Sequence, residues 1–128
     1  MGIQFCIAMD DFSFDNYNNI IKEMLKKSLF TQRQIEIILN FKNIEQIDLG
    51  ISKGAYYRQV SQSREKLSSL YYSIVLLRVL GILLPDDIDV LSKLSQQASV
   101  LKDGDVFAER EEDIISVINQ VISKTTAM

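Results

Sequence analysis

Side chains that can recognise the bases and phosphates of a nucleic acid recur between residues 53 and 66. The guanidinium group of Arg58 can donate two hydrogen bonds to guanine, and the amide of Gln62 can pair with adenine. We therefore expect these two residues to contact base edges, with neighbouring hydroxyl and ammonium groups contacting phosphates. The complete set of candidate DNA contacts is Lys53, Tyr57, Arg58, Ser61, Gln62, Arg64, Lys66, Arg33 and Lys42.

An amphipathic helix is the element that would position these side chains. Its inner face is predicted by a spacing of four, three and four residues between Tyr56, Val60, Ser63 and Leu67. The preceding Leu49-Gly50-Ile51-Ser52 has the order of a helix end, a turn glycine, an apolar residue and an N-cap. A short turn followed by such a helix is what a helix-turn-helix places in the major groove of DNA.

The same residues carry a resemblance to a known family. From Ser52 to Leu67 the chain resembles, without gaps, region four of bacterial sigma factors, and it is equally similar to the helix-turn-helix of response regulators and of some small archaeal regulators. The stretch Phe30 to Leu39 resembles the opening helix of that family, and Thr31 with Gln34 forms the pattern of a capping box. The resemblance covers residues 29–67 and implies a DNA-binding helix-turn-helix.

The family's second helix has little room in this chain. Only nine residues separate Leu39 from Leu49. We therefore expect one of two outcomes: the second helix is a single short turn, or the opening helix runs on and the topology differs.

Composition excludes several classes of functional site. The chain of 128 residues is 47% hydrophobic, which is enough for one domain or a small domain with an oligomerisation element. It contains no histidine and a single cysteine, Cys6, so zinc fingers, imidazole catalysis and an internal disulfide are excluded. A reduced, cytoplasmic location fits this composition, and the N-terminal apolar run lacks the basic flank of a signal peptide.

Two acidic clusters could in principle bind a divalent cation. The first comprises Asp86, Asp87 and Asp89, and the second comprises Asp103 and Asp105. The first follows Pro85, where carboxylates favour a helix start, and the second surrounds a turn glycine. With no glycine-rich phosphate loop or nucleophile motif either, we expect no enzyme activity, no metal and no cofactor.

Charge differs between the two halves of the chain. Residues 22–66 carry nine basic and five acidic side chains, a net charge of +4, whereas residues 71–128 carry five basic and nine acidic ones, a net charge of −4. Such asymmetry is typical of a DNA-binding part joined to an acidic part that faces a partner. We expect residues 1–69 to hold an N-terminal helix and the helix-turn-helix, and residues 70–128 to form a single compact helical dimerisation part.

Helical periodicity predicts the remaining elements. We expect a strand or extended arm over 1–11, a helix over 14–29, one long helix over 55–80, and helices starting at Pro85 and near Arg110. The long helix becomes apolar on all faces beyond Leu70, so it must be buried on all sides. A second copy of the chain is the expected cover, and a central helix in a monomeric bundle is the alternative. The expected dimerisation residues are Leu70, Ile74, Leu77, Val79, Leu80 and Leu84.

These features together predict an all-α, homodimeric transcription regulator that binds a pseudo-palindromic DNA site. A second hypothesis is a non-enzymatic protein–protein interaction module on a helix-turn-helix scaffold, in which the acidic C-terminal half binds a polymerase subunit or another regulator. A viral or plasmid accessory protein with the same fold is compatible with both. No membrane interaction is expected.

Overall fold

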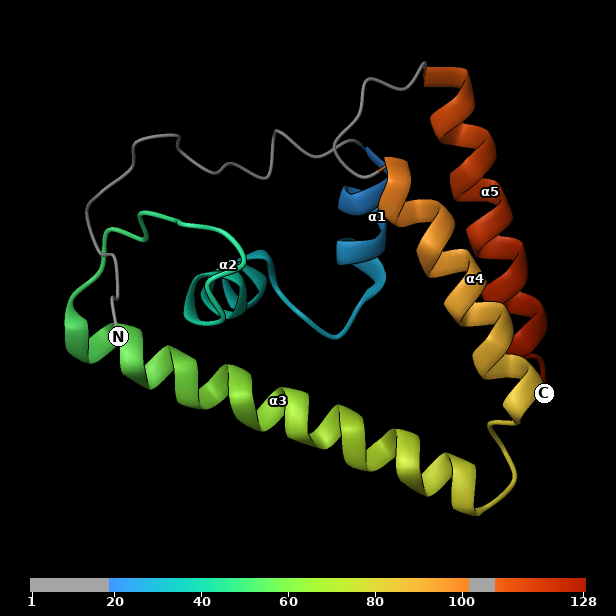
Figure 1. The fold of residues 1–128 in the computed structure, drawn as a ribbon, viewed down its shortest axis with the longest axis horizontal. Helices are drawn as coiled ribbons and strands as arrows, with labels where there is room; N and C mark the ends of the chain where they lie inside the picture. Colours follow the sequence, from blue (N-terminus) through green and yellow to red (C-terminus); the bar gives the residue numbers. More distant parts are fainter. Residues whose placement is uncertain (1–18, 102–107) are drawn as a thin grey trace.

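Five α-helices form the regular structure of residues 19–101 and 108–128, which are the residues that the computed structural model describes. They are α1 (Asn19–Lys27), α2 (Gln32–Phe41), α3 (Lys53–Val79), α4 (Pro85–Leu101) and α5 (Ala108–Thr125). No strand occurs in these ranges, which confirms the all-α class (Figure 1). Four predicted features lie outside the described residues: the arm over 1–11, the first residues of the helix from 14, Cys6, and the turn at Asp103 and Asp105.

Helix α2 is closed at both ends by local hydrogen bonds. Thr31 and Gln34 form the expected capping box, each side chain accepting a hydrogen bond from the other residue's backbone amide. At the other end Asn43 adopts a left-handed backbone with φ of 58°. The amide of Ile44 donates to the carbonyl of Leu39 at 2.9 Å, and that of Asn43 to Asn40 at 3.1 Å. This pair of bonds is a Schellman motif, which stops the helix at Phe41.

The connector between α2 and α3, residues 42–52, contains no helix, and α2 ends at Phe41. Neither expected outcome therefore occurs: a short second helix is absent, and the opening helix does not run on. The prediction that Leu49 ends a helix is therefore wrong. Gly50 does take the predicted left-handed backbone, with φ of 63°, but it follows an extended segment. Its amide donates to the Asp48 carboxylate at 3.0 Å, which forms a tight side-chain turn instead of a helix cap.

Helix α3 is one continuous rod of 27 residues, close to the predicted span of 55–80. At 1.5 Å per residue it is about 40 Å long. It begins at Ser52, whose hydroxyl accepts a hydrogen bond from the amide of Ala55 at 3.2 Å, as the sequence predicted. Figure 1 shows α2 lying across its first half and α4 leaving from its far end. The two halves of α3 therefore have different surroundings.

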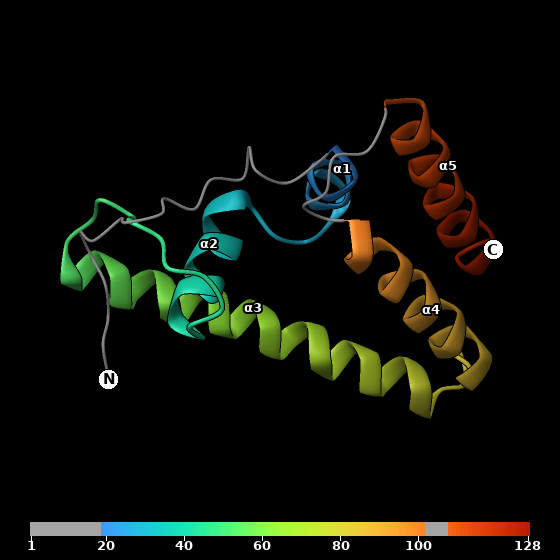
Figure 2. The same ribbon diagram turned by 45° about the horizontal axis from the view of Figure 1, so that its top comes forward.

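Two separate hydrophobic cores hold the helices together. The first joins α2, the connector and the first half of α3 through Ile37, Ile47, Leu49, Tyr56 and Val60. The second joins α1, α4 and α5 through Ile20, Ala98 and Ile118. Figure 2 shows the two groups of helices side by side, with α3 extending from one to the other.

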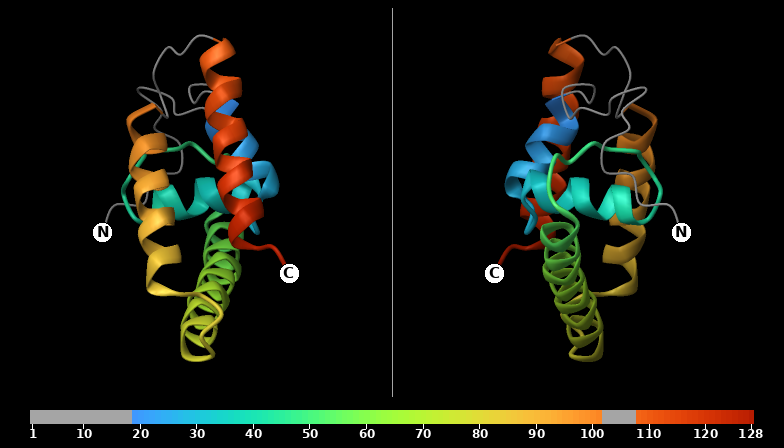
Figure 3. Two further views of the ribbon diagram at one scale, coloured as in Figure 1. Left: turned by 90° about the vertical axis from the view of Figure 1, so that its right-hand side faces the viewer. Right: turned by 90° about the vertical axis from the view of Figure 1, so that its left-hand side faces the viewer.

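Polar contacts complete the second group. The carboxylate of Asp87 accepts a hydrogen bond from the amide of Leu84 at 2.9 Å, so this acid caps α4 as predicted. Glu111 on α5 is buried and accepts hydrogen bonds from the backbone amide and the side-chain amide of Asn19, both at 3.1 Å. This carboxylate thereby satisfies the first amide of α1 and fixes α1 against α5. Figure 3 looks along α3 and shows α4 and α5 rising from one side of it.

Among the described residues, most side chains in the second half of α3 are left exposed. Tyr72 and Val79 are 75% and 76% exposed, and Leu80 and Leu84, which follow the helix, are at least half exposed. The alternative prediction, in which this segment is the central helix of a monomeric bundle, is therefore wrong for this structure. Of the predicted dimerisation residues, Leu70 and Leu77 are half-buried and Ile74 is exposed. Within the described ranges, no helix combines the length and the apolar character that crossing a membrane requires.

Candidate nucleic-acid interface

A buried hydrogen-bond chain fixes the first half of α3 against α2. The hydroxyl of Tyr56, on the inner face of α3, donates to Oδ1 of Asn40 at 2.8 Å. The side-chain amide of Asn40 in turn donates to the carbonyl of Ile47 at 3.0 Å. Asn40 thus joins α2, the connector and α3 at a single point, where the connector itself is not helical. This role of Asn40 was not predicted from the sequence.

Burial keeps this chain in one protonation state. Tyr56 has no exposed surface, and Asn40 is buried with it. Burial raises the pKa of the Tyr56 hydroxyl above its ordinary value of 10.0, and neighbouring Tyr57 raises it further. The hydroxyl therefore remains protonated and able to donate to Asn40 throughout the physiological range.

The outer face of α3 presents five of the predicted contacts to solvent. They are Lys53, Tyr57, Arg58, Ser61 and Gln62, all of them exposed. We refer to these five residues as the outer face. The ring of Tyr57 packs edge-on against that of Tyr56 at a centroid distance of 5.4 Å, which limits its mobility. The outer face is thus a row of hydrogen-bonding groups on a helix whose opposite side is fixed.

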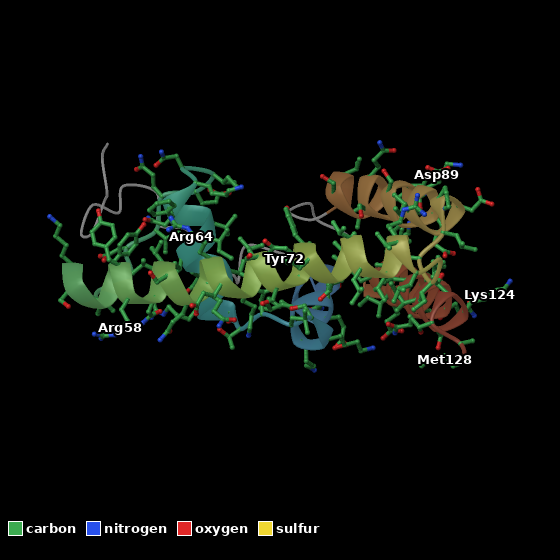
Figure 4. All side chains as sticks on the ribbon, turned by 90° about the horizontal axis from the view of Figure 1, so that it is seen from below. Arg58, Arg64, Tyr72, Asp89, Lys124 and Met128 are labelled. Atoms are coloured by element: carbon green, nitrogen blue, oxygen red, sulfur yellow. The ribbon has the colours of Figure 1, made fainter. Side chains whose placement is uncertain are left out.

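Arg64 and Lys42 lie to one side of the outer face. The guanidinium group of Arg64 lies over the ring of Phe41 at 5.7 Å, at the C-terminal end of α2. Lys42 is exposed and lines a small groove of 210 Å³ together with Arg64. Figure 4 shows Arg58 and Arg64 on opposite sides of α3. The structure therefore places Arg64 beside the C-terminal end of α2, apart from Arg58.

Lys66 and Arg33 are engaged in contacts within the protein. The ammonium group of Lys66 donates to the carbonyl of Leu29 at 2.7 Å and to Oε1 of Gln34 at 3.1 Å. Arg33 donates to the carbonyl of Leu49 at 3.3 Å, and its guanidinium group lies 3.7 Å from the Glu36 carboxylate. Both cations therefore hold α2 and its flanking segments against α3 or the connector, in addition to any role on DNA.

An acidic side chain limits the outer face at one end. Glu65 is exposed and lies four residues after Ser61 and seven after Arg58, so it continues the same face. A carboxylate repels phosphate oxygens, which restricts a DNA-binding surface to the first three turns of α3. The spacing of seven residues between Arg58 and Glu65 is a signal for this boundary that is visible in the sequence. It was not used in the prediction.

Among the described residues, no group of histidine, cysteine, aspartate or glutamate side chains could hold a metal ion. The cluster of Asp86, Asp87 and Asp89 therefore does not converge on a common point. Comparison of the chain with protein-family models, with curated proteins and with solved structures finds no match.

Proposed function

We propose that this chain is a non-enzymatic, sequence-specific DNA-binding transcription regulator of helix-turn-helix type that acts as a homodimer. The outer face of α3 enters the major groove in this proposal. One combination of features supports the proposal. The first turns of α3 expose a row of cationic, amide and hydroxyl groups, and the opposite side of the same turns is held by a buried hydrogen-bond chain. A helix fixed in this way can hold base-contacting groups in register with a groove.

Each part of the outer face has a role in this proposal. Arg58 and Gln62, one helical turn apart, contact base edges, and Ser61 and Tyr57 contact the sugar–phosphate backbone or a thymine methyl group beside them. Lys53 lies in the first turn of α3, where the helix dipole already favours a phosphate. Arg64 and Lys42 contact phosphates along the edge formed by the end of α2. Residues 29–67 resemble sigma factor region four only in α2 and the first half of α3, because the second helix of that family is absent here.

The electrostatics of the chain favour binding through the α2–α3 end. Residues 31–67 carry six basic and four acidic side chains, a net charge of +2 that includes Lys53 and Arg58 of the outer face, while α4 and α5 are acidic. The other half of the +4 over residues 22–66 lies on α1, which packs with α4 and α5. An acidic protein with a local basic surface binds DNA in one orientation, because its other surfaces repel the phosphates.

Replacement of the two base-contacting residues tests the proposal. A double variant, Arg58→Ala with Gln62→Ala, should bind a DNA site selected from a random pool at least about 30-fold more weakly, since each lost base contact costs about 1 to 3 kcal/mol. Binding is measured by fluorescence anisotropy at fixed salt. The matched control is Arg110→Ala with Gln97→Ala, which removes the same two exposed side-chain types from α5 and α4 and should leave affinity unchanged. Equal affinities of the two double variants would refute the proposal.

The acidic second half and its exposed apolar side chains favour a second candidate function. In that case α4 and α5 engage a polymerase subunit or another regulator, and the first half of α3 is a scaffold. Salt dependence separates the two functions. Affinity for DNA through phosphate contacts falls steeply between 50 and 200 mM salt by about 10³ for six contacts, whereas an apolar protein interface changes little over that range.

A further inference from the structure

An apolar groove lies between α1, α4 and α5, beside the second hydrophobic core. It has a volume of about 770 Å³. Its floor includes Ile20, Leu94, Ala98 and Ile118, and its wall on α5 includes Ile122, which is 42% exposed. Three helices that share a core and leave one apolar side open resemble a four-helix bundle that lacks one helix.

The same chain carries an apolar helix segment of matching length. The groove spans Leu91 to Ser99 on α4 and Ile115 to Ser123 on α5, each about 12 Å at 1.5 Å per residue. The exposed apolar segment of α3, from Tyr71 to Leu80, is about 14 Å long by the same measure. Arg78 is the only charged residue in it. Helix and groove therefore agree in length and in apolar character.

The corner between α3 and α4 prevents a chain from filling its own groove. Gly81 has φ of 74°, its amide donates to Arg78 at 3.1 Å, and the amide of Ile82 donates to Leu77 at 2.9 Å. This Schellman motif is reinforced by Arg78, whose guanidinium group donates to the carbonyl of Leu83 at 2.9 Å. The corner fixes the direction in which α4 leaves α3, so folding α3 back onto α4 and α5 would break these bonds.

We propose that the second half of α3 docks in the α1–α4–α5 groove of a second copy of the chain, and that the exchange is reciprocal. This inference rests on the homodimer of the proposed function and specifies its interface. Each copy then completes a four-helix bundle with the partner's α3, and the two outer faces remain exposed. The dimer is thus isologous: the contact between α3 of one copy and the groove of the other occurs twice, about a two-fold axis.

The exposed area is sufficient for such a dimer. Seven large apolar side chains between Tyr71 and Leu80 are nearly two-fifths or more exposed. At on the order of 100 Å² each, they represent on the order of 700 Å² per copy. This exceeds the few hundred Å² that a soluble monomer usually leaves exposed. Because each copy also contributes its groove, the interface approaches the roughly 800 Å² per partner of a stable complex.

Two charge substitutions on α5 test whether the groove is the docking site. Ile122→Glu places a carboxylate in the groove, and Val117→Glu places one on a side chain of similar exposure, 48%, that does not line it. Burial of an unpaired charge should raise the dimer dissociation constant of Ile122→Glu at least about 100-fold. Val117→Glu should dimerise like the wild type. Mass is measured by light scattering over a dilution series, and circular dichroism checks the helix content. If Ile122→Glu loses helix content, Ser95→Arg on the α4 wall, where the side chain is exposed, replaces it.

Mixing two defective variants tests the reciprocal exchange. Val79→Lys, on the docking segment of α3, should be monomeric on its own, like Ile122→Glu. A mixture should form a heterodimer, because the unaltered α3 of the Ile122→Glu chain can enter the unaltered groove of the Val79→Lys chain. One of the two contacts is then fully wild type. If Ile122→Glu dimerises normally while Val79→Lys does not, α3 packs elsewhere and the inference is refuted. A wild-type monomer, or a mixture that stays monomeric, refutes it as well.

DNA binding to a half-site separates this inference from the proposed function. The monomeric variants keep the outer face, so they should bind a single half-site as tightly as wild-type chains do at the same monomer concentration. Retained half-site binding together with a normal Ile122→Glu dimer would refute only the docking geometry. Loss of DNA binding by Arg58→Ala and Gln62→Ala has no bearing on the mass measurements.

Discussion

Removal of the Tyr56 hydroxyl tests whether the buried hydrogen-bond chain holds the outer face in position. Tyr56→Phe keeps the ring, and with it the packing against Val60 and Ile37, but leaves Oδ1 of Asn40 without the donor that lies at 2.8 Å. Asn40 is buried, so water cannot readily replace this donor. The second bond of the chain, from Asn40 to the carbonyl of Ile47, remains possible.

The expected loss follows from this geometry. A buried acceptor that loses its partner costs about 1 to 3 kcal/mol. For a chain of 128 residues, with an unfolding entropy near 2.1 cal/mol/K per residue, this corresponds to a decrease in Tm of roughly 4 to 11 °C. Urea denaturation at fixed protein concentration should show a lower midpoint with an unchanged slope.

The pH dependence of the free energy of unfolding should differ between the wild type and Tyr56→Phe. Because the pKa of Tyr56 is raised in the folded state, its contribution to stability is fully present below the unfolded value of 10.0 and is lost as pH rises through the folded value. The wild type should therefore lose stability above pH 10 more steeply than Tyr56→Phe, and the difference between them should shrink. A loss below 0.5 kcal/mol at neutral pH, or parallel stability curves above pH 10, would show that this hydroxyl does not secure α3.

Two further substitutions test local features of α3 by urea denaturation. Gly81→Ala should lower the free energy of unfolding by about 1 to 2 kcal/mol, because alanine is strained at φ of 74°, whereas Gly54→Ala, in the first turn of α3 with ordinary φ and open space at its Cβ position, should raise it by up to about 1 kcal/mol. Effects of equal sign would contradict the role of the Schellman corner. Ser63→Ala should raise the free energy of unfolding by up to about 1 kcal/mol, since among the described residues the Ser63 hydroxyl is buried without a hydrogen-bond partner. A loss of more than 1 kcal/mol would show that this hydroxyl has a stabilising partner.

The starts of α2, α3 and α4 were predictable because their signals are local. The Thr31–Gln34 capping box, the Ser52 cap and the Asp87 cap each involve residues no more than three positions apart. The span of α3 followed from its uninterrupted helical pattern. In these cases backbone groups near a helix end select a partner from their own turn, so the sequence alone identifies it.

The connector was predicted incorrectly because the order of Leu49, Gly50, Ile51 and Ser52 was interpreted as a helix end followed by a turn and a cap. Residues Ile47 and Leu49 are buried, while Asp48 and Gly50 are exposed. This alternation has the period of an extended segment and was visible in the sequence. What was not visible is the support for that segment, since the carbonyls of Ile47 and Leu49 find Asn40 and Arg33 only after α2 and the connector pack together.

Some of the predicted DNA contacts are exposed and others are engaged within the protein, and only the exposed ones followed from local patterns. Positions on the outer face followed from helical spacing within α3. By contrast, the engagement of Lys66 depends on the carbonyl of Leu29, 37 residues away in sequence, which no local pattern identifies. Arg64, which was predicted on the same face as Arg58, lies on the other side of α3 over Phe41. The partners of the cationic side chains thus depended on tertiary contacts.

The bonds between Asn19 and Glu111 have a consequence for the order of folding. They join positions 92 residues apart, whereas the core between α2 and α3 forms within residues 31–67. Closing the longer loop costs more chain entropy and is slower, and that cost is recovered only when α1, α4 and α5 meet. The α2–α3 unit should thus assemble first. During synthesis, it can be complete before α5 has emerged from the ribosome, and the groove-forming half is the last part of the chain to become ordered.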